Sequence, residues 1–336
     1  MKISLIVPCY NESEVLGEFF RRVNLLAEKL ASYEFEFLFV NDGSTDSTAE
    51  ILNSFADKDL RVKVLHFARN QGHQISLTAG MDFASGDYIV TIDADLQDPP
   101  EVIPEMIEKM SEGYQVIHAQ RRTRAGETGF KLFTAWLFYQ VMCRFLARDI
   151  VPDSGDFRAF TRQVMKVIRG FREKHRFLRG TFAVVGFKQC IVKYDRDSRF
   201  AGETKYPVKK MIKLAADAVL SFSSSPIRAI TWLSLLLWSS SLIYLVKALI
   251  EKFILHETVQ GWTSIIFLLT FFTGLNLFCL GIIGSYIGRI FEQGQKRPLY
   301  WLSNVRNVKR NEIDPEISDF EEVKIADCIF SEGPEK

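Results

Sequence analysis

Three carboxylates lie within six residues, at Asp93, Asp95 and Asp98, at the end of the apolar run 88–92. Asp93 and Asp95 are suited to Mg²⁺ or Mn²⁺, because these hard cations prefer carboxylate, water and phosphate oxygens as ligands. Gln97 points to the same face as Asp95 if strand geometry continues to that residue. The spacing therefore predicts a divalent metal site at residues 93–97.

The common phosphate-binding loops are absent from the sequence, which contains neither Gly-x-Gly-x-x-Gly nor the Walker A pattern. The charge of a bound diphosphate must still be offset, and a carboxylate cluster can do this only by holding a divalent cation. We expect Asp98 to begin the following helix, beside Pro99 and Pro100, rather than to bind the metal.

Short continuous apolar runs alternate with helical stretches over the first two hundred residues. This pattern predicts an α/β domain with a mainly parallel sheet that is covered on both faces. The predicted strands are residues 3–8, 35–40, 62–67, 88–92 and 114–119, and the predicted helices include residues 14–31, 47–55 and 100–111. Ligands of such sheets bind beyond the carboxyl ends of the strands, so the residues after each run are the candidates.

Polar turns follow four of these predicted strands. Tyr10 and Glu12 follow the first, Asp42 the second, Gln71 the third and Asp93 the fourth. Each turn alone has an ordinary structural explanation, such as a bend or a helix cap. The four turns together on one rim indicate a binding site.

Two long apolar runs, residues 229–250 and 264–290, exceed the length that a helix needs to span a bilayer. The alternative is a pair of buried core helices. Lysine and arginine flank the outer ends of both runs, so the positive-inside rule places both termini in the cytoplasm. Four glycines in the second run would also let it pack closely against another helix, including one from a second copy of the chain.

Four segments follow from these patterns. We expect a cytoplasmic α/β domain at residues 1–206, an amphipathic juxtamembrane helix at 207–228, a transmembrane hairpin at 229–290 and a basic, then acidic cytoplasmic tail at 291–336. The apolar run at the N-terminus is too short for a signal peptide. Five scattered cysteines show neither zinc spacing nor a disulfide framework, and a net charge of +1 does not indicate nucleic-acid binding.

Several motifs carry a resemblance to a known family. "SLIVPCYNE", "VNDGSTDST", "ARNQG" and "TIDADLQDPPE", in this order and spacing, resemble the GT-A glycosyltransferases of family 2. "DSGDFRAF", "RFLRG" and "RFAGETKYPVKK" further resemble the branch that uses polyprenyl phosphates, in which a Rossmann-like GT-A domain is followed by interface helices. The two apolar runs are similar to the tail of the glucosyl-type members.

The resemblance implies a role for each matching residue. Pro8, Tyr10, Glu12 and Asp42 would hold the nucleoside together with Gln71, Asp93 would lie beside the ribose and diphosphate, and Asp95 and Gln97 would take the metal. Arg121, Lys131 and Arg199 would grip the acceptor phosphate, and Asp156, in a turn at residues 153–156, would lie near the sugar and acceptor.

Basic and amphipathic segments agree with an anionic lipid acceptor. Arg121, Arg122 and Arg124 form a cluster suited to phosphate, for which the alternative is a solvated basic face. Residues 208–222 have an apolar stripe with a lysine flank, and residues 130–146 carry interfacial aromatics; both fit the headgroup region or, alternatively, a protein core.

The predicted reaction is the inverting transfer of a hexose, glucose from UDP-glucose, to undecaprenyl phosphate at the cytoplasmic membrane face. The acceptor phosphate is already mostly ionised at neutral pH, since its second pKa is about 6, so a strong general base is unnecessary. Three alternatives stay open: GDP-mannose or UDP-amino-arabinose as donor, a processive polysaccharide synthase, and a non-catalytic membrane adaptor. The Gln-x-x-Arg-Trp motif that such synthases share is absent.

Overall fold

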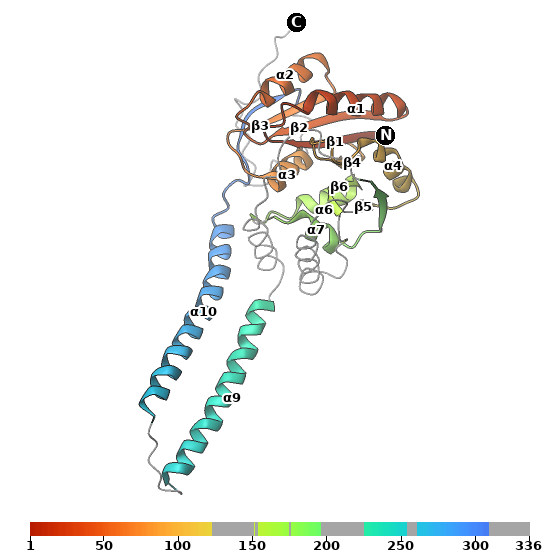
Figure 1. Ribbon diagram of the computed structural model, residues 1–336. Helices are drawn as coiled ribbons and strands as arrows, with labels where there is room; N and C mark the ends of the chain where they lie inside the picture. The colour runs from red at the N-terminus through yellow and green to blue at the C-terminus, as the bar shows by residue number, and fades with distance from the viewer. Residues whose placement is uncertain (123–150, 152–153, 175, 196–224, 254–260, 309–336) are drawn as a thin grey trace. The chain divides into compact units, whose positions relative to one another are not determined.

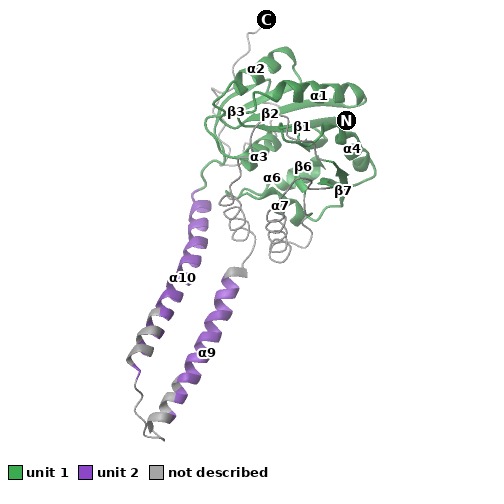
Figure 2. Cartoon of the chain, viewed as in Figure 1, with its two compact units in different colours: residues 1–211, 296–336 green, residues 212–295 purple. Residues whose placement is uncertain are grey.

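The computed structural model describes residues 1–122, 151, 154–174, 176–195, 225–253 and 261–308. The chain forms two compact units (Figure 2). One unit comprises Met1–Met211 with Lys296–Lys336, and the other comprises Ile212–Gln295. The described part of the first unit carries a β-sheet with its helices, and the described part of the second consists of two long helices.

An eight-stranded sheet forms the centre of the first unit, in the order β7-β5-β6-β4-β1-β2-β3-β8 (Figure 1). The strands are β1 (Lys2–Cys9), β2 (Glu34–Asn41), β3 (Val62–Phe67), β4 (Tyr88–Thr91), β5 (Val116–Arg121), β6 (Ser154–Thr161), β7 (Gln189–Tyr194) and β8 (Leu302–Arg306). Strands β1 to β4 pair in parallel, as do β5 and β7, whereas β6 and β8 run antiparallel to their neighbours. The predicted mainly parallel sheet and all five predicted strands are confirmed.

Helices cover both faces of this sheet. They are α1 (Leu16–Lys29), α2 (Thr48–Lys58), α3 (His73–Phe83), the 3₁₀ helix η1 (Pro100–Val102), α4 (Ile103–Ser111), α6 (Arg162–Arg169) and α7 (Leu178–Val184). Phe19 of α1 and Leu52 of α2 belong to the core on one face, and Leu77 of α3 and Phe182 of α7 belong to the core on the other. Successive side chains of a strand point to opposite faces of the sheet. Because both faces are buried here, the central strands are apolar at nearly every position.

Strand β8 lies in a segment that the sequence analysis assigned to the tail, and no strand was predicted there. The segment is anchored in the core by Tyr300, whose ring stacks on Phe67 with 5.4 Å between the centroids. The Tyr300 hydroxyl donates a hydrogen bond of 2.9 Å to Asp82 in α3. The chain that follows the second long helix therefore completes the sheet edge beside β3.

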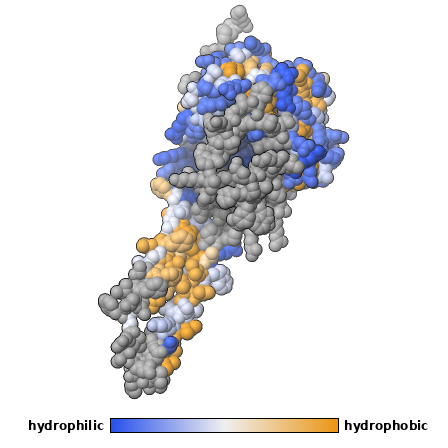
Figure 3. Space-filling view, viewed as in Figure 1, coloured by the Kyte–Doolittle hydropathy of each residue, from blue (hydrophilic) through white to orange (hydrophobic). Residues whose placement is uncertain are grey.

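The second unit contains α9 (Ser225–Phe253) and α10 (Trp262–Gly294). Within them, Ile227–Tyr244 and Phe271–Gly294 are long and apolar enough to cross a membrane, and none of either window is buried inside the described protein. Figure 3 shows hydrophobic surface over these helices. Exposed apolar helices of this length indicate membrane association and argue against the core-helix alternative. The predicted amphipathic segments 130–146 and 208–222 lie outside the described residues.

Glu36 is the centre of a buried ionic network in β2, at the amino-terminal end of the parallel strands. Its carboxylate is 2.8 Å from Lys2 Nζ and 3.0 Å from Lys63 Nζ, and it accepts hydrogen bonds from Ser4 and Ser85. Burial alone would raise the pKa of Glu36, but Lys63, Lys2 and these hydrogen bonds lower it to about 2.

We predict that Glu36→Gln lowers the free energy of unfolding by roughly 3 kcal/mol at pH 7, because it removes the carboxylate that lies 3.0 Å from the buried Lys63 ammonium group and balances its charge. The pKa of Glu36 is lower in the folded than in the unfolded chain, where it is about 4.3. Its stabilisation is therefore complete above pH 4.3 and is lost as the pH falls towards 2. Guanidinium unfolding from pH 7 down to pH 3 measures whether the difference between the two proteins shrinks. Glu18→Gln, at an exposed pair, is the control and should leave stability unchanged.

Candidate functional site

Asp42 closes a tight turn at the carboxyl end of β2. Its side chain is only 3% exposed and accepts hydrogen bonds from the backbone N–H groups of Gln71, at 2.6 Å, and Gly72, at 2.9 Å. Gly43 has a φ of 64°, and a Cβ atom there would lie 2.5 Å from the carbonyl carbon of Arg69. Only glycine fits this close crossing, so the turn after β2 and the loop after β3 are fixed against each other. Burial raises the pKa of Asp42, although the two N–H groups oppose this.

The loop after β1 is tied to the start of α2. Asn11 Oδ1 accepts a hydrogen bond of 2.8 Å from the backbone N–H of Thr45, and Thr48 Oγ1 accepts one of 2.9 Å from the N–H of Glu12. Tyr10 stays 47% exposed beside this loop, while Pro8 is buried in β1. Four of the predicted nucleoside-binding residues, Tyr10, Glu12, Asp42 and Gln71, thus lie on loops after the carboxyl ends of β1, β2 and β3, and Pro8 lies within β1 near its carboxyl end.

The acidic segment after β4 is a turn rather than a continued strand. Strand β4 ends at Thr91, Leu96 has a φ of 58°, and the backbone N–H of Gln97 donates a hydrogen bond of 3.1 Å to Asp95 Oδ1. The premise that strand geometry aligns Gln97 with Asp95 is therefore wrong. Because Leu96 adopts a left-handed conformation, the chain reverses and Asp95 caps its own turn.

Asp156 binds several donors at once in β6. His73 Nε2 lies 3.2 Å from Asp156 Oδ2, Gln74 donates to the same oxygen at 3.0 Å, and Arg179 donates to Oδ1 at 3.2 Å. Arg158 lies behind it at 3.9 Å. The expected turn around Asp156 is also wrong, since Ser154–Thr161 is a strand paired with β4 and β5.

His73 joins this cluster to Asp93, with Nε2 3.5 Å from Asp93 Oδ1. Burial would lower the pKa of His73, but the carboxylates of Asp93 and Asp156 outweigh it and raise that pKa to about 9. Burial raises the pKa of Asp93 to about 6; His73 opposes this, and neighbouring aspartates add to it. Burial also favours the neutral form of Asp156, yet Arg179 and His73 hold its pKa well below the usual range. At neutral pH an imidazolium therefore lies between two carboxylates.

Arg121 lies at the end of β5, where its guanidinium is 3.3 Å from Asp98 Oδ1 and 3.2 Å from the Tyr194 hydroxyl. Asp98 is buried, and Tyr194 also donates a hydrogen bond to it. The expectation that Asp98 begins the next helix is therefore corrected, because its carboxylate turns inward to Arg121 and Tyr194. Gly155 packs against the Arg121 guanidinium, which places Arg121 next to the strand of Asp156. Arg124, Lys131 and Arg199 lie outside the described residues.

The acidic turn provides an incomplete ligand set for a divalent cation. No three histidine, cysteine, aspartate or glutamate side chains in the described parts of the chain are arranged to hold a metal ion. Asp93 and Asp95 nevertheless fit one, because burial, with a smaller contribution from neighbouring aspartates, raises the pKa of Asp93, and a bound cation would favour its charged form. One or two carboxylates, with water and substrate phosphates, are the usual protein share of a Mg²⁺ site.

His73, Gln74, Arg158 and Arg179 were not predicted as site residues. His73 and Gln74 follow directly after the "ARNQG" motif, and Arg179 lies in "RFLRG", so the only signal in the sequence was their proximity to these motifs. The hydrogen bonds of Gln74 and Arg179 with Asp156 join residues that are 82 and 23 positions apart in the sequence.

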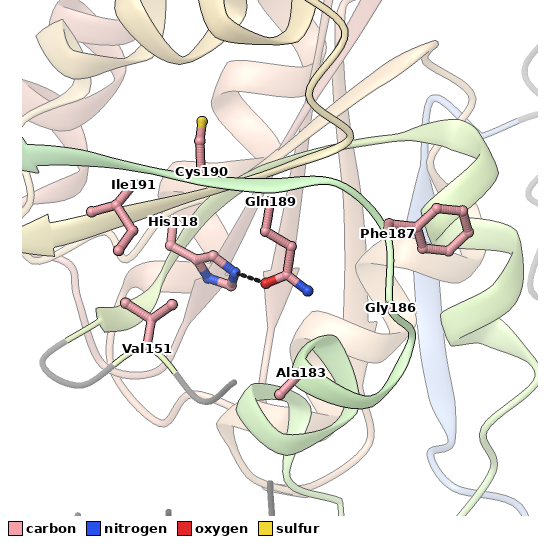
Figure 4. Close-up of a pocket in the computed structure, with 8 residues that line it drawn as sticks. All are labelled: His118, Val151, Ala183, Gly186, Phe187, Gln189, Cys190 and Ile191. Carbon is pink, nitrogen blue, oxygen red and sulfur yellow. Dashed lines mark hydrogen bonds between the residues drawn. The ribbon is translucent and has the colours of Figure 1, made fainter. Parts of the chain in front are cut away.

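A separate cavity of about 470 Å³ lies between β5, β7 and α7 (Figure 4). His118 and Gln189, which share a hydrogen bond of 2.8 Å, line it together with the apolar side chains of Val151, Ala183 and Ile191. Burial and nearby Arg158 lower the pKa of His118 to about 3, so its imidazole is neutral. None of the predicted site residues is among those that line this cavity.

Comparisons with known proteins identify a family and several relatives that this chain is similar to. The family profile described as Glycosyl transferase family 2 matches residues 4–169. An uncharacterized glycosyltransferase of Bacillus subtilis (strain 168) is 46% identical over 300 residues, which cover 89% of this chain and 93% of the relative. The bactoprenol glucosyl transferase of Shigella phage SfV is 38% identical over 304 residues, covering 90% of this chain and 99% of the relative.

A likeness to solved structures was also found. Glucosyl-3-phosphoglycerate synthase from Mycobacterium tuberculosis, crystallised with Mn²⁺, uridine-diphosphate-glucose and phosphoglyceric acid, aligns with a TM-score of 0.43 and 18% identity. The alignment covers 66% of this chain and 78% of that structure.

Proposed function

We propose a function that proceeds from one fact: the chain belongs to glycosyl transferase family 2. The reaction is the transfer of glucose from UDP-glucose to a polyprenyl phosphate at the cytoplasmic face of the membrane. One observation carries this proposal above others. The similarity to a bactoprenol glucosyl transferase spans 99% of that relative, so it includes the apolar helices as well as the sheet.

The nucleoside would bind over the turn after β2. Asp42 is buried, and its position just after the end of β2 suits a hydrogen bond from the base. Gln71 supports the same placement, because its side-chain nitrogen is buried without a hydrogen-bond partner among the described residues. A buried donor of this kind is costly unless a ligand or water accepts from it.

Asp93, Asp95 and Gln97 would face the diphosphate. A divalent cation held by this turn would neutralise the departing nucleoside diphosphate. The aspartates near Asp93, which add to the raised pKa of its carboxyl group, support this assignment.

Asp156 would orient the reacting groups rather than accept a proton. Its two oxygens already receive hydrogen bonds from Gln74 and Arg179, and its pKa is held well below the usual range. The acceptor phosphate has a second pKa of about 6 and is mostly ionised at pH 7, so the nucleophilic oxygen needs no base. Attack in line with the leaving diphosphate would invert the anomeric carbon, and positioning with charge neutralisation would supply the rate.

Arg121 would supply a cation for the acceptor phosphate, together with Lys131 and Arg199. Its guanidinium is anchored by Asp98 and Tyr194, which orients a fork suited to phosphate oxygens. The proposal also includes the four segments predicted from the sequence, with both termini in the cytoplasm. It further includes an association of two copies of the chain through the glycines of the second apolar run.

Release of nucleoside diphosphate by the detergent-purified protein tests the reaction. UDP-glucose, GDP-mannose and UDP-amino-arabinose are each supplied with and without undecaprenyl phosphate, and with Mg²⁺, Mn²⁺ or a chelator. We expect UDP release that requires UDP-glucose, lipid and metal together. Release from another donor would reassign the sugar, release without lipid would favour a polymerising enzyme, and no release with any donor would favour an adaptor.

A further inference from the structure

We propose that His73 is a positioning residue that bridges Asp93 and Asp156 and so holds the diphosphate side and the acceptor side of the site in a fixed relation. This inference rests on the proposed function, since it assigns those sides from the same reaction. His73 belongs to no motif that the sequence analysis assigned a role.

The backbone around His73 is held independently of its side chain. His73 is the first residue of α3, and it follows Gly72, whose φ is 98° and whose N–H donates to Asp42. The N–H of Gln71 donates to the same carboxylate. One stretch, residues 71–74, therefore contacts the buried aspartates that end β2 and begin β6, as well as the acidic turn after β4.

The two carboxylates that His73 contacts differ in the other side chains that contact them. Asp156 also receives hydrogen bonds from Gln74 and Arg179, so it remains anchored if His73 is changed. Among the described residues, Asp93 makes a side-chain ion-pair contact with His73 and with no other group. Loss of the imidazole therefore frees Asp93, which the proposed function places beside the diphosphate, and leaves Asp156 in place.

The geometry of the contact makes a specific prediction about substitutions. Both contacts use Nε2, at 3.2 Å from Asp156 and 3.5 Å from Asp93. The side-chain amide nitrogen of glutamine can occupy the place of Nε2, whereas that of asparagine reaches only the place of Nδ1. His73→Gln should therefore retain the bridge, and His73→Asn and His73→Ala should lose it.

The experiment measures kcat and donor KM for the full-length protein and the three variants, with UDP-glucose and undecaprenyl phosphate. A displaced reacting group typically lowers the rate by about 10²-fold, so we expect that loss of kcat in His73→Asn and His73→Ala. His73→Gln should stay within about tenfold of the wild type, and donor KM should change by less than about threefold throughout. The Kd for UDP and the thermal midpoint are measured in parallel and should stay close to those of the wild type.

His118→Gln is the matched control, because it makes the same substitution at a histidine that lines the cavity beside β5 and β7 and contacts neither Asp93 nor Asp156 in the described structure. Equal activity in wild type and His73→Ala would overturn the inference alone. A rise in donor KM at unchanged kcat would also overturn it, because it would indicate a role in substrate binding. Equal losses of kcat in His73→Gln and His73→Asn, together with a lower thermal midpoint, would overturn it as well, because they would indicate a structural role. A wild-type protein that transfers no glucose would overturn the proposed function and, with it, this inference.

Discussion

Asp156→Asn should lower kcat for glucose transfer by about 10²- to 10³-fold, the range seen when one preorganised polar group is removed from an active site. The asparagine would turn an amide N–H towards donors that now all point at carboxylate oxygens. His73, Gln74 and Arg179 would compete for the one remaining acceptor oxygen. Arg158 and Arg179 would also lose the negative charge of the Asp156 carboxylate. Steady-state assays at saturating donor and lipid measure this loss.

A double-mutant cycle with Arg179 separates orientation from simple loss of charge. Arg179→Gln alone should lower kcat strongly, and the double variant should be little worse than either single variant, because both changes break the same contact. Arg21→Gln, at an exposed pair on α1, is the control and should leave kcat unchanged. Additive losses in the cycle would contradict a shared role for Asp156 and Arg179.

Asp42→Ala should raise the Kd for UDP and the donor KM by about 10²-fold. The change removes the carboxylate that accepts hydrogen bonds from the N–H groups of Gln71 and Gly72 and, in the proposed complex, from the base. Hydrogen bonds to charged groups contribute about 1.5–3 kcal/mol, which corresponds to this change. The loop Gln71–Gly72 would also lose the carboxylate that fixes it. Calorimetric titration with UDP measures the Kd without requiring the lipid or catalysis.

Two further variants sharpen this test. Asp42→Asn keeps one acceptor oxygen and should weaken UDP binding by about tenfold, in line with the loss of one such bond. Asp59→Asn changes an aspartate at the opposite end of the sheet, where it pairs with Arg61, and should leave UDP binding unchanged. If Asp42→Ala bound UDP as tightly as the wild type, the nucleoside could not lie over the turn after β2.

The strands β1 to β5 could be predicted because each is a continuous apolar run buried on both faces. Strand β6 could not, since its sequence "SGDFRAFT" carries Asp156 and Arg158 inside the sheet. Arg158 is only 2% exposed, and it is accommodated because it donates to the Gly155 carbonyl oxygen and lies over the Phe182 ring. These compensating contacts come from tertiary structure and leave no periodic pattern.

The same limit applies to the site. Asp42 and Asp93 were predicted because they follow strands directly, and strand ends converge in any parallel sheet. His73 and Arg179 were missed because their contacts with Asp156 depend on how α3 and α7 pack over β6. Strand geometry does not continue to Gln97, because β4 ends at Thr91 and Leu96 has a left-handed conformation.

The most direct test of glucose transfer to a polyprenyl phosphate is the destination of the sugar. The purified protein is incubated with UDP-[¹⁴C]glucose, undecaprenyl phosphate and Mg²⁺, and the organic and aqueous phases are then separated and counted. We predict lipid-dependent label in the organic phase, released as glucose by mild acid, and a rate of labelling about 10²- to 10³-fold lower with the Asp156→Asn variant. Release of UDP with all of the label left in the aqueous phase would contradict transfer to the lipid.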